Sequence, residues 1–335
     1  MMLRGKKWVL WLLAPLLLGI AVACGGGEEE VVQVQLALDW YPNANHTGLY
    51  VAFERGYFED ENLEVEMYTP SDPSTVNATV AAGSDDFGIN YQPDVLIARS
   101  QGVPVVSIAG IVQHPLNSVQ SLASSNITRP RDLVGKKVGY PGIPTNEPLL
   151  DTMLRFDGVE EGLGAVELVN VGFNLAESLI DDRVDACIGC YFSHESILME
   201  NQGYPVNVMR LENFGVPDYY ELVLVTSEDM LEENPDIVQR FVRAVTRGYA
   251  DAAADPDTAI EILLSAAGED VDADIERPGI KVIAPLWTEG APVGWQTEEK
   301  WANFAQWLLD NNQVEEAVDA GAAFTNEFVE EASGQ

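Results

Sequence analysis

The sequence predicts an α/β protein with two lobes and a helical C-terminal third. Short β-rich runs alternate with helical stretches from residue 32 to about residue 115, and the same alternation restarts after residue 116. This alternation is typical of sheets whose strands are largely parallel. The uninterrupted apolar run at residues 105–112 fits a strand that is covered on both faces. Two such lobes form a clamp that encloses a ligand beyond the carboxyl ends of its strands.

Composition excludes several classes of protein. The 335 residues include 18 Lys and Arg against 54 Asp and Glu, which gives a net charge of −36. Nucleic-acid binding needs clustered Lys and Arg, so we expect no nucleic-acid partner. Hydrophobic residues make up 47% of the chain, which argues against disorder and supports a sizeable core.

The N-terminus has the pattern of a secretory signal. A basic start, Arg4 with Lys6 and Lys7, is followed by an apolar run at residues 8–20, which is too short for a comfortable membrane span. No later apolar run is long enough to cross a bilayer. We therefore expect residues 1–23 to be a signal peptide.

The signal ends at a cysteine in a context that resembles a bacterial lipobox. Small residues precede Cys24, although Ala21 stands where Leu is usual, and residues 24–31 have the composition of a flexible charged tether. The expectation is that Cys24 is acylated and holds the protein on the extracytoplasmic face of the cell membrane. The alternative is an ordinary signal peptide with an incidental cysteine.

The first lobe is expected to contain residues 32–115 and 221–335. Val32, Val34 and Leu36 alternate on one face of the first strand, and Pro93 marks the start of a helix that Gly102 closes. The predicted strands are residues 32–38, 65–68, 87–90, 105–112 and 222–226. The predicted helices are residues 48–55, 74–82, 93–99, 235–254, 256–266, 297–311 and 326–331.

The second lobe is expected to contain residues 116–220. Its predicted strands are residues 119–123, 137–140, 166–171, 185–188 and 206–209, and its predicted helices are residues 147–156, 176–180 and 193–201. His114 lies where the chain should cross between the lobes.

Unusual residue strings follow the predicted strands. Residues 39–46 read Asp-Trp-Tyr-Pro-Asn-Ala-Asn-His, and residues 90–94 read Asn-Tyr-Gln-Pro-Asp. In the second lobe, residues 139–142 read Gly-Tyr-Pro-Gly and residues 185–191 read Asp-Ala-Cys-Ile-Gly-Cys-Tyr. Together these strings resemble the ABC-importer solute-binding proteins of the thiamine-pyrimidine-precursor family, over residues 32–225 and more weakly to residue 311.

The resemblance implies a type II periplasmic-binding-protein clamp that works with separate permease and ATPase subunits. The main branch of the family binds the aminopyrimidine half of thiamine or its formylamino salvage form. A sister branch binds riboflavin, and fungal relatives are enzymes that build the pyrimidine. All of these ligands are flat nitrogen heterocycles.

The first string supplies candidate ligand-binding residues. Trp40 could close the top of the core, but the polar residues around it, Asp39, Asn43 and Asn45, favour a binding role. A flat ring can stack on the indole, while the carboxylate and the amides meet ring-edge groups. Tyr91, which follows Asn90 before a helix N-terminus, is a second candidate aromatic residue.

The second lobe supplies the remaining candidates. Thr145 and Asn146 could cap a helix, but Glu147 matches the carboxylate that, by the resemblance, accepts the N–H groups of an aminopyrimidine. Asn174 and Tyr191 follow other strands of the same lobe. We expect no catalytic residues and no cofactor, because the chain has no nucleophile elbow, zinc-protease motif or phosphate loop.

The cysteine pair Cys187 and Cys190 is open to several interpretations. It could be a metal half-site, a redox pair, a disulfide or a pair of buried apolar residues. There is no second such pair, so we expect no metal. Trp301 and Trp307, with Phe304 between them, have the spacing of a core-facing helix.

The expected function is that of the substrate-binding lipoprotein of a vitamin importer. Riboflavin is the first expectation, because its polyol tail needs many hydrogen-bonding groups and the strand ends supply Asn43, Asn45, Asn90, Thr145, Asn146 and Asn174. The alternative ligand is the thiamine pyrimidine precursor. Less expected are a pyrimidine synthase, which the secretory signal argues against, and a chemoreceptor accessory with the same clamp.

Overall fold

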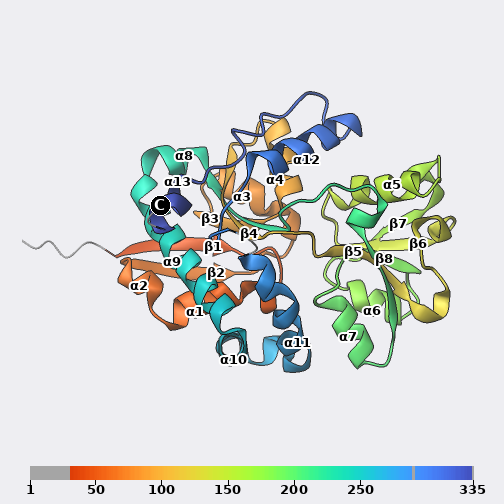
Figure 1. Ribbon diagram of the computed structural model, residues 1–335, viewed down its shortest axis with the longest axis horizontal. Coiled ribbons are helices and arrows are strands. Elements are labelled where there is room, and N and C mark those ends of the chain that lie inside the picture. Colours follow the sequence, from red (N-terminus) through yellow and green to blue (C-terminus); the bar gives the residue numbers. More distant parts are fainter. Residues whose placement is uncertain (1–30, 289–290, 334–335) are drawn as a thin grey trace, which may run out of the picture. The chain divides into compact units, whose positions relative to one another are not determined.

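The computed structural model describes residues 31–288 and 291–333, which form two five-stranded sheets with helices around them (Figure 1). The predicted signal peptide, Cys24 and all of the tether except Val31 lie outside the described residues. Within those two ranges, no helix is long and apolar enough to cross a membrane.

The first sheet contains strands from both ends of the described chain. Its strands are β1 (Val32–Ala37), β2 (Leu63–Tyr68), β3 (Phe87–Asn90), β4 (Val105–Val112) and β10 (Leu222–Ser227). They lie in the order β2-β1-β3-β10-β4. β1 runs parallel to β2 and β3, whereas β10 is antiparallel to both of its neighbours. Every residue of β4 and β10 is buried, so the prediction of a strand covered on both faces is confirmed for β4.

Ten helices of the described chain surround or extend this sheet. They are α1 (Thr47–Glu54), α2 (Tyr57–Asp60), α3 (Val76–Ala81), α4 (Gln92–Ser100), α8 (Glu228–Glu233), α9 (Pro235–Ala254), α10 (Pro256–Ala267), α11 (Ala273–Ile283), α12 (Glu298–Asp310) and α13 (Glu327–Ser333). Three of them, α2, α8 and α11, were not predicted. The first two are too short to show a helical period, and α11 contains Pro278, which usually ends a helix.

Glycine allows α1 and α9 to pack in close contact. A Cβ on Gly248 would lie 2.2 Å from the carbonyl oxygen of Gly48, and one on Gly48 would lie 2.2 Å from the Tyr249 ring. In α12, Trp301, Phe304 and Trp307 are all buried, which confirms their predicted role in the core.

The second sheet is built from the middle of the chain. Its strands are β5 (Asn117–Leu122), β6 (Lys137–Tyr140), β7 (Glu167–Asn170), β8 (Ala186–Tyr191) and β9 (Val206–Arg210), in the order β7-β6-β8-β5-β9. β6 runs parallel to β7 and β8, whereas β5 is antiparallel to β8 and β9. Three helices accompany this sheet: α5 (Asn146–Phe156), α6 (Leu175–Ile180) and α7 (Glu195–Asn201).

The α/β class with two largely parallel sheets is confirmed. Each sheet contains one strand that runs against the others, β10 in the first and β5 in the second. The chain passes from one sheet to the other twice, between β4 and β5 and between β9 and β10. The predicted lobe boundaries at residues 115/116 and 220/221 stay a prediction.

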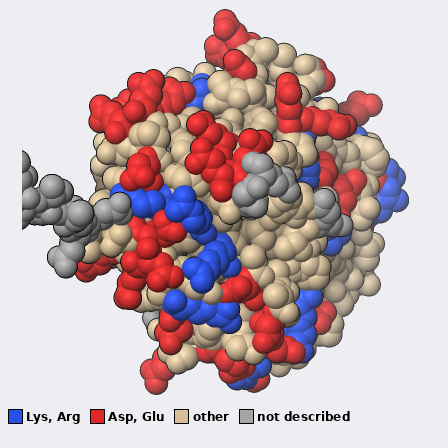
Figure 2. Space-filling model, turned by 60° about the vertical axis from the view of Figure 1, so that its left-hand side comes forward, with Lys and Arg blue, Asp and Glu red and all other residues tan. Residues whose placement is uncertain are grey.

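Basic and acidic side chains are interspersed on the face that includes α2 and α9 (Figure 2). On α9, Arg243 pairs with Glu61 at 2.7 Å and Arg247 pairs with Asp60 at 3.3 Å. Arg55 pairs with Asp251. These arginines are therefore partly neutralised by the acidic residues beside them.

Candidate ligand-binding site

A pocket lies between the two sheets, at the edge where the parallel strands of each sheet end. Because β5 and β10 are antiparallel to their neighbours, their first residues lie at this same edge. The lining residues are Asp39, Trp40, Asn43, Tyr91, Pro93, Asn117, Pro141, Ile143, Thr145, Asn146, Leu149, Gly189, Tyr191, His194, Glu195, Tyr219 and Glu221.

Tyr91, which directly follows β3 of the first sheet, forms one wall of the pocket and is held there by hydrogen bonds. The hydroxyl of Tyr91 donates to Asp39 Oδ2 at 2.9 Å, and Asp39 Oδ1 lies 2.9 Å from His46 Nε2. All three side chains are buried. Burial, followed by the charge of Asp39, raises the pKa of Tyr91 well above its ordinary value. Tyr91 is therefore a neutral, fixed ring at the pocket wall.

Glu221 is a second anchor, placed just before β10. Its Oε2 accepts from the backbone N–H groups of Leu116 (2.6 Å) and Asn117 (2.9 Å), and its Oε1 accepts from the hydroxyl of Tyr191 at 3.0 Å. Tyr219 also donates to it, at 3.2 Å. Burial raises the pKa of Glu221 to about 7, against the opposing effect of these hydrogen bonds. Glu221 thus lies on one segment that passes between the sheets and bonds the other at Leu116 and Asn117. It also holds Tyr191 and Tyr219 at the pocket.

Two amides line the pocket beside these residues, Asn117 at the start of β5 and Asn146 at the start of α5. Asn117 Nδ2 donates to Asn146 Oδ1 at 2.9 Å, and Asn117 Oδ1 accepts from the backbone N–H of Gly189 at 2.9 Å. Asn146 Nδ2 lies 3.3 Å from the carbonyl oxygen of Ile143. These hydrogen bonds fix the orientation of both side-chain amides, so the positions of each oxygen and each NH2 group are defined.

A carboxylate, Glu195, opens α7 at the pocket. Its Oε2 accepts from the backbone N–H of Tyr191 at 2.7 Å, and its Oε1 lies 3.1 Å from His194 Nδ1. The other ring nitrogen of His194 pairs with Glu276 of α11 at 3.2 Å. Burial lowers the pKa of His194, but the two carboxylates outweigh it and raise that pKa to about 10. His194 is thus a cation that links α7 to α11.

Further contacts connect segments of the two sheets around the pocket. Trp40, after β1, meets Phe173 of the segment before α6 edge to face, with ring centroids 4.4 Å apart. Thr145 does not cap α5 with its side chain; its hydroxyl donates to Asp94 of α4 at 2.5 Å. The His194–Glu276 pair is a third such contact.

The pocket brings together Asp39, Trp40, Asn43, Tyr91, Thr145, Asn146 and Tyr191 of the predicted site. It does not include Asn45, Asn90, Glu147 or Asn174. Asn45 and Asn90 are buried beside it; the N–H of Asn45 bonds Asn43 Oδ1, and Asn90 Oδ1 accepts from the N–H of Tyr91. Glu147 lies against Tyr140, whose pKa is raised by partial burial and by that carboxylate. Asn174 is exposed and lies beside Phe173.

Sequence reasoning missed five polar or aromatic lining residues, namely Asn117, His194, Glu195, Tyr219 and Glu221. Asn117 and Glu221 were missed because β5 and β10 were not expected to run antiparallel. Glu221 could have been found from the sequence, because it is a single acidic residue directly before an apolar strand. Glu195 follows Tyr191 by four residues, and the spacing alone does not show that the chain turns back there.

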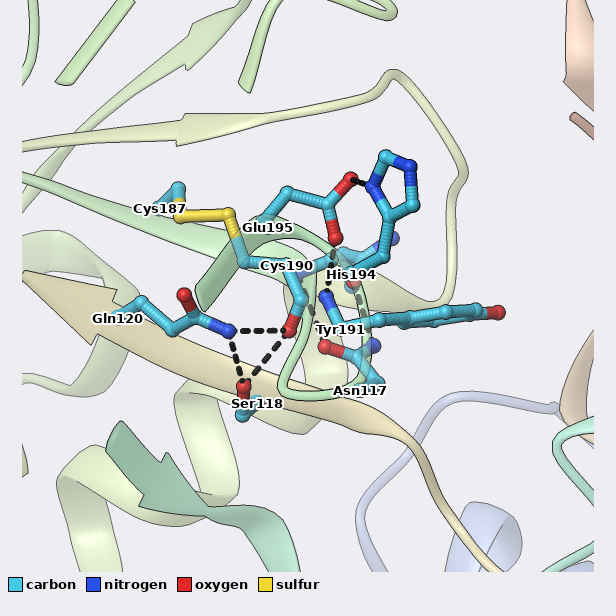
Figure 3. Close-up of a disulfide and its surroundings, with 10 residues drawn as sticks. Asn117, Ser118, Gln120, Cys187, Cys190, Tyr191, His194 and Glu195 are labelled. Atoms are coloured by element: carbon cyan, nitrogen blue, oxygen red, sulfur yellow. Dashed lines mark hydrogen bonds and ion pairs between the residues drawn. A yellow bond between two sulfur atoms is a disulfide. The ribbon is translucent and has the colours of Figure 1, made fainter. Parts of the chain in front are cut away.

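The cysteine pair is a disulfide, Cys187–Cys190, within β8 (Figure 3). It lies beside the pocket, which Gly189 and Tyr191 of the same strand line. This resolves the four interpretations of the pair. In the described parts of the chain, no group of three or more His, Cys, Asp or Glu side chains is arranged to hold a metal ion.

Solved structures share this fold at low sequence identity. The alkanesulfonate-binding protein SsuA from Xanthomonas axonopodis pv. citri matches with a TM-score of 0.69 at 14% identity, over 88% of this chain and 99% of that one. The type II periplasmic-binding-protein clamp expected from the sequence is confirmed. This likeness shows the fold, which is that of the periplasmic solute-binding proteins.

The chain belongs to the NMT1/THI5-like family, whose model matches residues 43–259. The formylaminopyrimidine-binding protein of Halalkalibacterium halodurans is 37% identical over 97% of this chain and 99% of its own length. The riboflavin-binding protein RibY of Chloroflexus aurantiacus is 28% identical over 92% and 89%. A relative from Legionella pneumophila, 26% identical over 89% and 92%, is named 4-amino-5-hydroxymethyl-2-methylpyrimidine phosphate synthase.

Proposed function

We propose that this protein binds a formylaminopyrimidine-type precursor of thiamine and delivers it to an ABC importer. The observation that carries the proposal is the 37% identity to a formylaminopyrimidine-binding protein over 97% of this chain. The riboflavin-binding relative is less similar, at 28%. The pyrimidine precursor, the alternative in the sequence analysis, therefore replaces riboflavin as the proposed ligand.

The chemistry of the pocket fits an aminopyrimidine. Such a ring has two flat faces, acceptor nitrogens in its plane and an exocyclic amine that donates. Trp40, Tyr91 and Tyr191 supply aromatic surfaces around the pocket. The amides of Asn117 and Asn146 supply in-plane donors and acceptors. These are the groups that a flat, polar-edged heterocycle needs.

We assign the amine-binding carboxylate to Glu195 in place of Glu147. Glu195 lines the pocket, and its two oxygens already bond the Tyr191 N–H and His194. A carboxylate has about four acceptor sites, so capacity remains for an N–H donor of the ligand. The protonated His194 lies beside it, with its Nδ1 3.1 Å from Glu195 Oε1.

Membrane attachment and the partner subunits are also part of this proposal. A lipid on Cys24 would retain the binding protein at the extracytoplasmic membrane face, close to its permease. The permease and ATPase are separate chains. No turnover of the ligand is expected.

Calorimetric titration of the purified soluble chain with formylaminopyrimidine and with riboflavin tests the proposal. We expect saturable one-to-one binding of formylaminopyrimidine, at least a hundredfold tighter than binding of riboflavin. The reverse preference would restore the riboflavin interpretation. Recovery of a chemically altered pyrimidine after incubation would support an enzyme instead.

A further inference from the structure

Strand β8 departs from regular geometry between its two cysteines. In its pairing with β5, Cys190 lies opposite Ser118 and Ile188 lies opposite Val119, so Gly189 has no partner residue. The Cα atoms of Cys187 and Cys190 are 6.1 Å apart, whereas three residues of a regular strand span about 10 Å. The strand is therefore shortened by a β-bulge at Gly189.

The bulge faces the ligand pocket. Gly189 has a φ of +91°, and a Cβ there would come 2.7 Å from Pro141 Cδ, so only glycine fits. Gly189 lines the pocket, and its N–H donates to Asn117 Oδ1. The bulge thus sets the orientation of Asn117, which in turn bonds Asn146. Tyr191, two residues further along β8, also lines the pocket.

The disulfide spans this bulge, from Cys187, which pairs with Gln120, to Cys190, which pairs with Ser118. In a regular strand, side chains three residues apart point to opposite faces, so Cys187 and Cys190 can be joined only when the strand is bulged. Both cysteines are buried in an apolar cluster with Leu175, Leu179 and Met199. The carbonyl oxygen of Cys190 accepts from Ser118 Oγ at 2.6 Å and from Gln120 Nε2 at 3.2 Å (Figure 3).

We propose that the Cys187–Cys190 disulfide is a positioning element of the ligand pocket. It holds β8 in the bulged form that aims the Gly189 N–H at Asn117 and places Tyr191 at the pocket wall. Without the bond, β8 can lengthen toward a regular strand, which withdraws the Gly189 N–H from Asn117. The inference rests on the proposed function for its ligand probe, formylaminopyrimidine.

The double substitution Cys187→Ser with Cys190→Ser tests this role, with formylaminopyrimidine binding and melting temperature measured on the same samples. We expect the dissociation constant to rise at least tenfold while the protein remains folded. Leu179→Ala is the matched control, because it removes packing from the same apolar cluster while the disulfide and Gly189 are kept. It should lower the melting temperature and leave the dissociation constant within twofold of wild type.

Two further measurements keep the test decisive if the serine variant folds poorly. The first uses the double alanine variant, which introduces no buried hydroxyl groups. The second uses wild type reduced with dithiothreitol, which needs no substitution; a thiol count confirms that both cysteines are reduced. Each should bind formylaminopyrimidine at least tenfold more weakly than the oxidised wild type. Reoxidation should restore the affinity of the reduced wild type.

Hydrogen exchange in the absence of ligand separates this inference from the proposed function. Loss of the bond should raise amide exchange in residues 186–191 by tenfold or more, and Leu179→Ala should not. If oxidised wild type binds no pyrimidine, the proposed function fails while the exchange measurement still tests the bulge. Unchanged exchange together with an unchanged dissociation constant in the fully reduced protein would overturn the inference.

Discussion

Trp40 stands half-buried at the pocket, with one edge against Phe173. If a flat ring stacks on it, Trp40→Ala should remove about 1–3 kcal/mol of binding free energy, the range for base-on-aromatic stacking. The dissociation constant for formylaminopyrimidine should then rise roughly tenfold to a hundredfold. Titration of ligand-induced tryptophan quenching measures it.

Trp307 provides the matched control for that experiment. It is buried in the α12 core against Phe304, at a centroid distance of 4.9 Å. Trp307→Ala should cost about 3–5 kcal/mol of unfolding free energy and leave the affinity of the folded protein nearly unchanged. If instead Trp40→Ala lowers stability by that amount and keeps the affinity of wild type, Trp40 belongs to the core and not to the site.

The choice between Glu195 and Glu147 is tested by parallel substitutions to glutamine. A hydrogen bond to a charged group contributes about 1.5–3 kcal/mol, so Glu195→Gln should weaken binding of the pyrimidine by tenfold or more. Glu147→Gln, outside the pocket, should stay within twofold of wild type. Calorimetry on both variants decides, and the opposite pattern would return the role to Glu147.

At the level of residues, the sequence located the aromatic part of the site better than the carboxylates. Trp40 and Tyr91 follow parallel strands whose ends meet at one edge, so their position follows from strand order alone. Glu147 is the second residue of α5. At this end of the helix, a difference of one residue decides whether a side chain lines the pocket, as Asn146 does, or lies outside it, as Glu147 does. The sequence does not fix that one-residue difference. The position of Glu221 at the pocket depends on the direction in which β10 runs. That direction is determined by pairing with β3 and β4, which are distant in the sequence.

Among the elements, α7 and α11 are joined by the ion pair of His194 with Glu276. Because the pKa of His194 is raised from 6.5 to about 10, its stabilising contribution is complete below pH 6.5. It is lost as the pH rises toward and through 10. Between pH 6 and 10.5, wild type should lose roughly 2 kcal/mol more unfolding free energy than His194→Asn, the scale of a charged hydrogen bond.

Melting temperatures of the two proteins over that pH range provide the measurement. Asp94 and Glu221, whose pKa values are raised to about 7 by burial, titrate in both proteins, so the difference isolates His194. Parallel pH curves for wild type and His194→Asn would show that the ring is not protonated in the fold.

Element prediction succeeded where one physical signal dominated. The buried β4 reads as a continuous apolar run, and the long α9 begins at Pro235 with a clear helical period. It failed at α11, where Pro278 interrupts the helical pattern. That helix persists because its apolar face, including Ile280 and Ile283, is buried in the core.

At the scale of the whole molecule, the lipoprotein proposal makes attachment to the membrane depend on Cys24. Cys24→Ser should shift the protein from the membrane fraction to the soluble extracytoplasmic fraction, because the acyl chains can no longer be attached. Ala21→Leu, which restores the usual lipobox residue, should remain fully membrane-bound. Immunoblots of the two fractions measure the distribution, and firm anchoring of the serine variant would contradict the lipoprotein proposal.

The position of β10 has a consequence for folding during synthesis. β10 lies between β3 and β4 in the first sheet, yet it begins only at residue 222 of 335. Until that segment leaves the ribosome, β3 and β4 have no strand between them, and the apolar run of β4 cannot be fully covered. The second sheet, in contrast, draws all of its strands from residues 117–210. We therefore expect the later-made middle of the chain to acquire its native sheet before the segment that precedes it, with the first sheet closing last around β10.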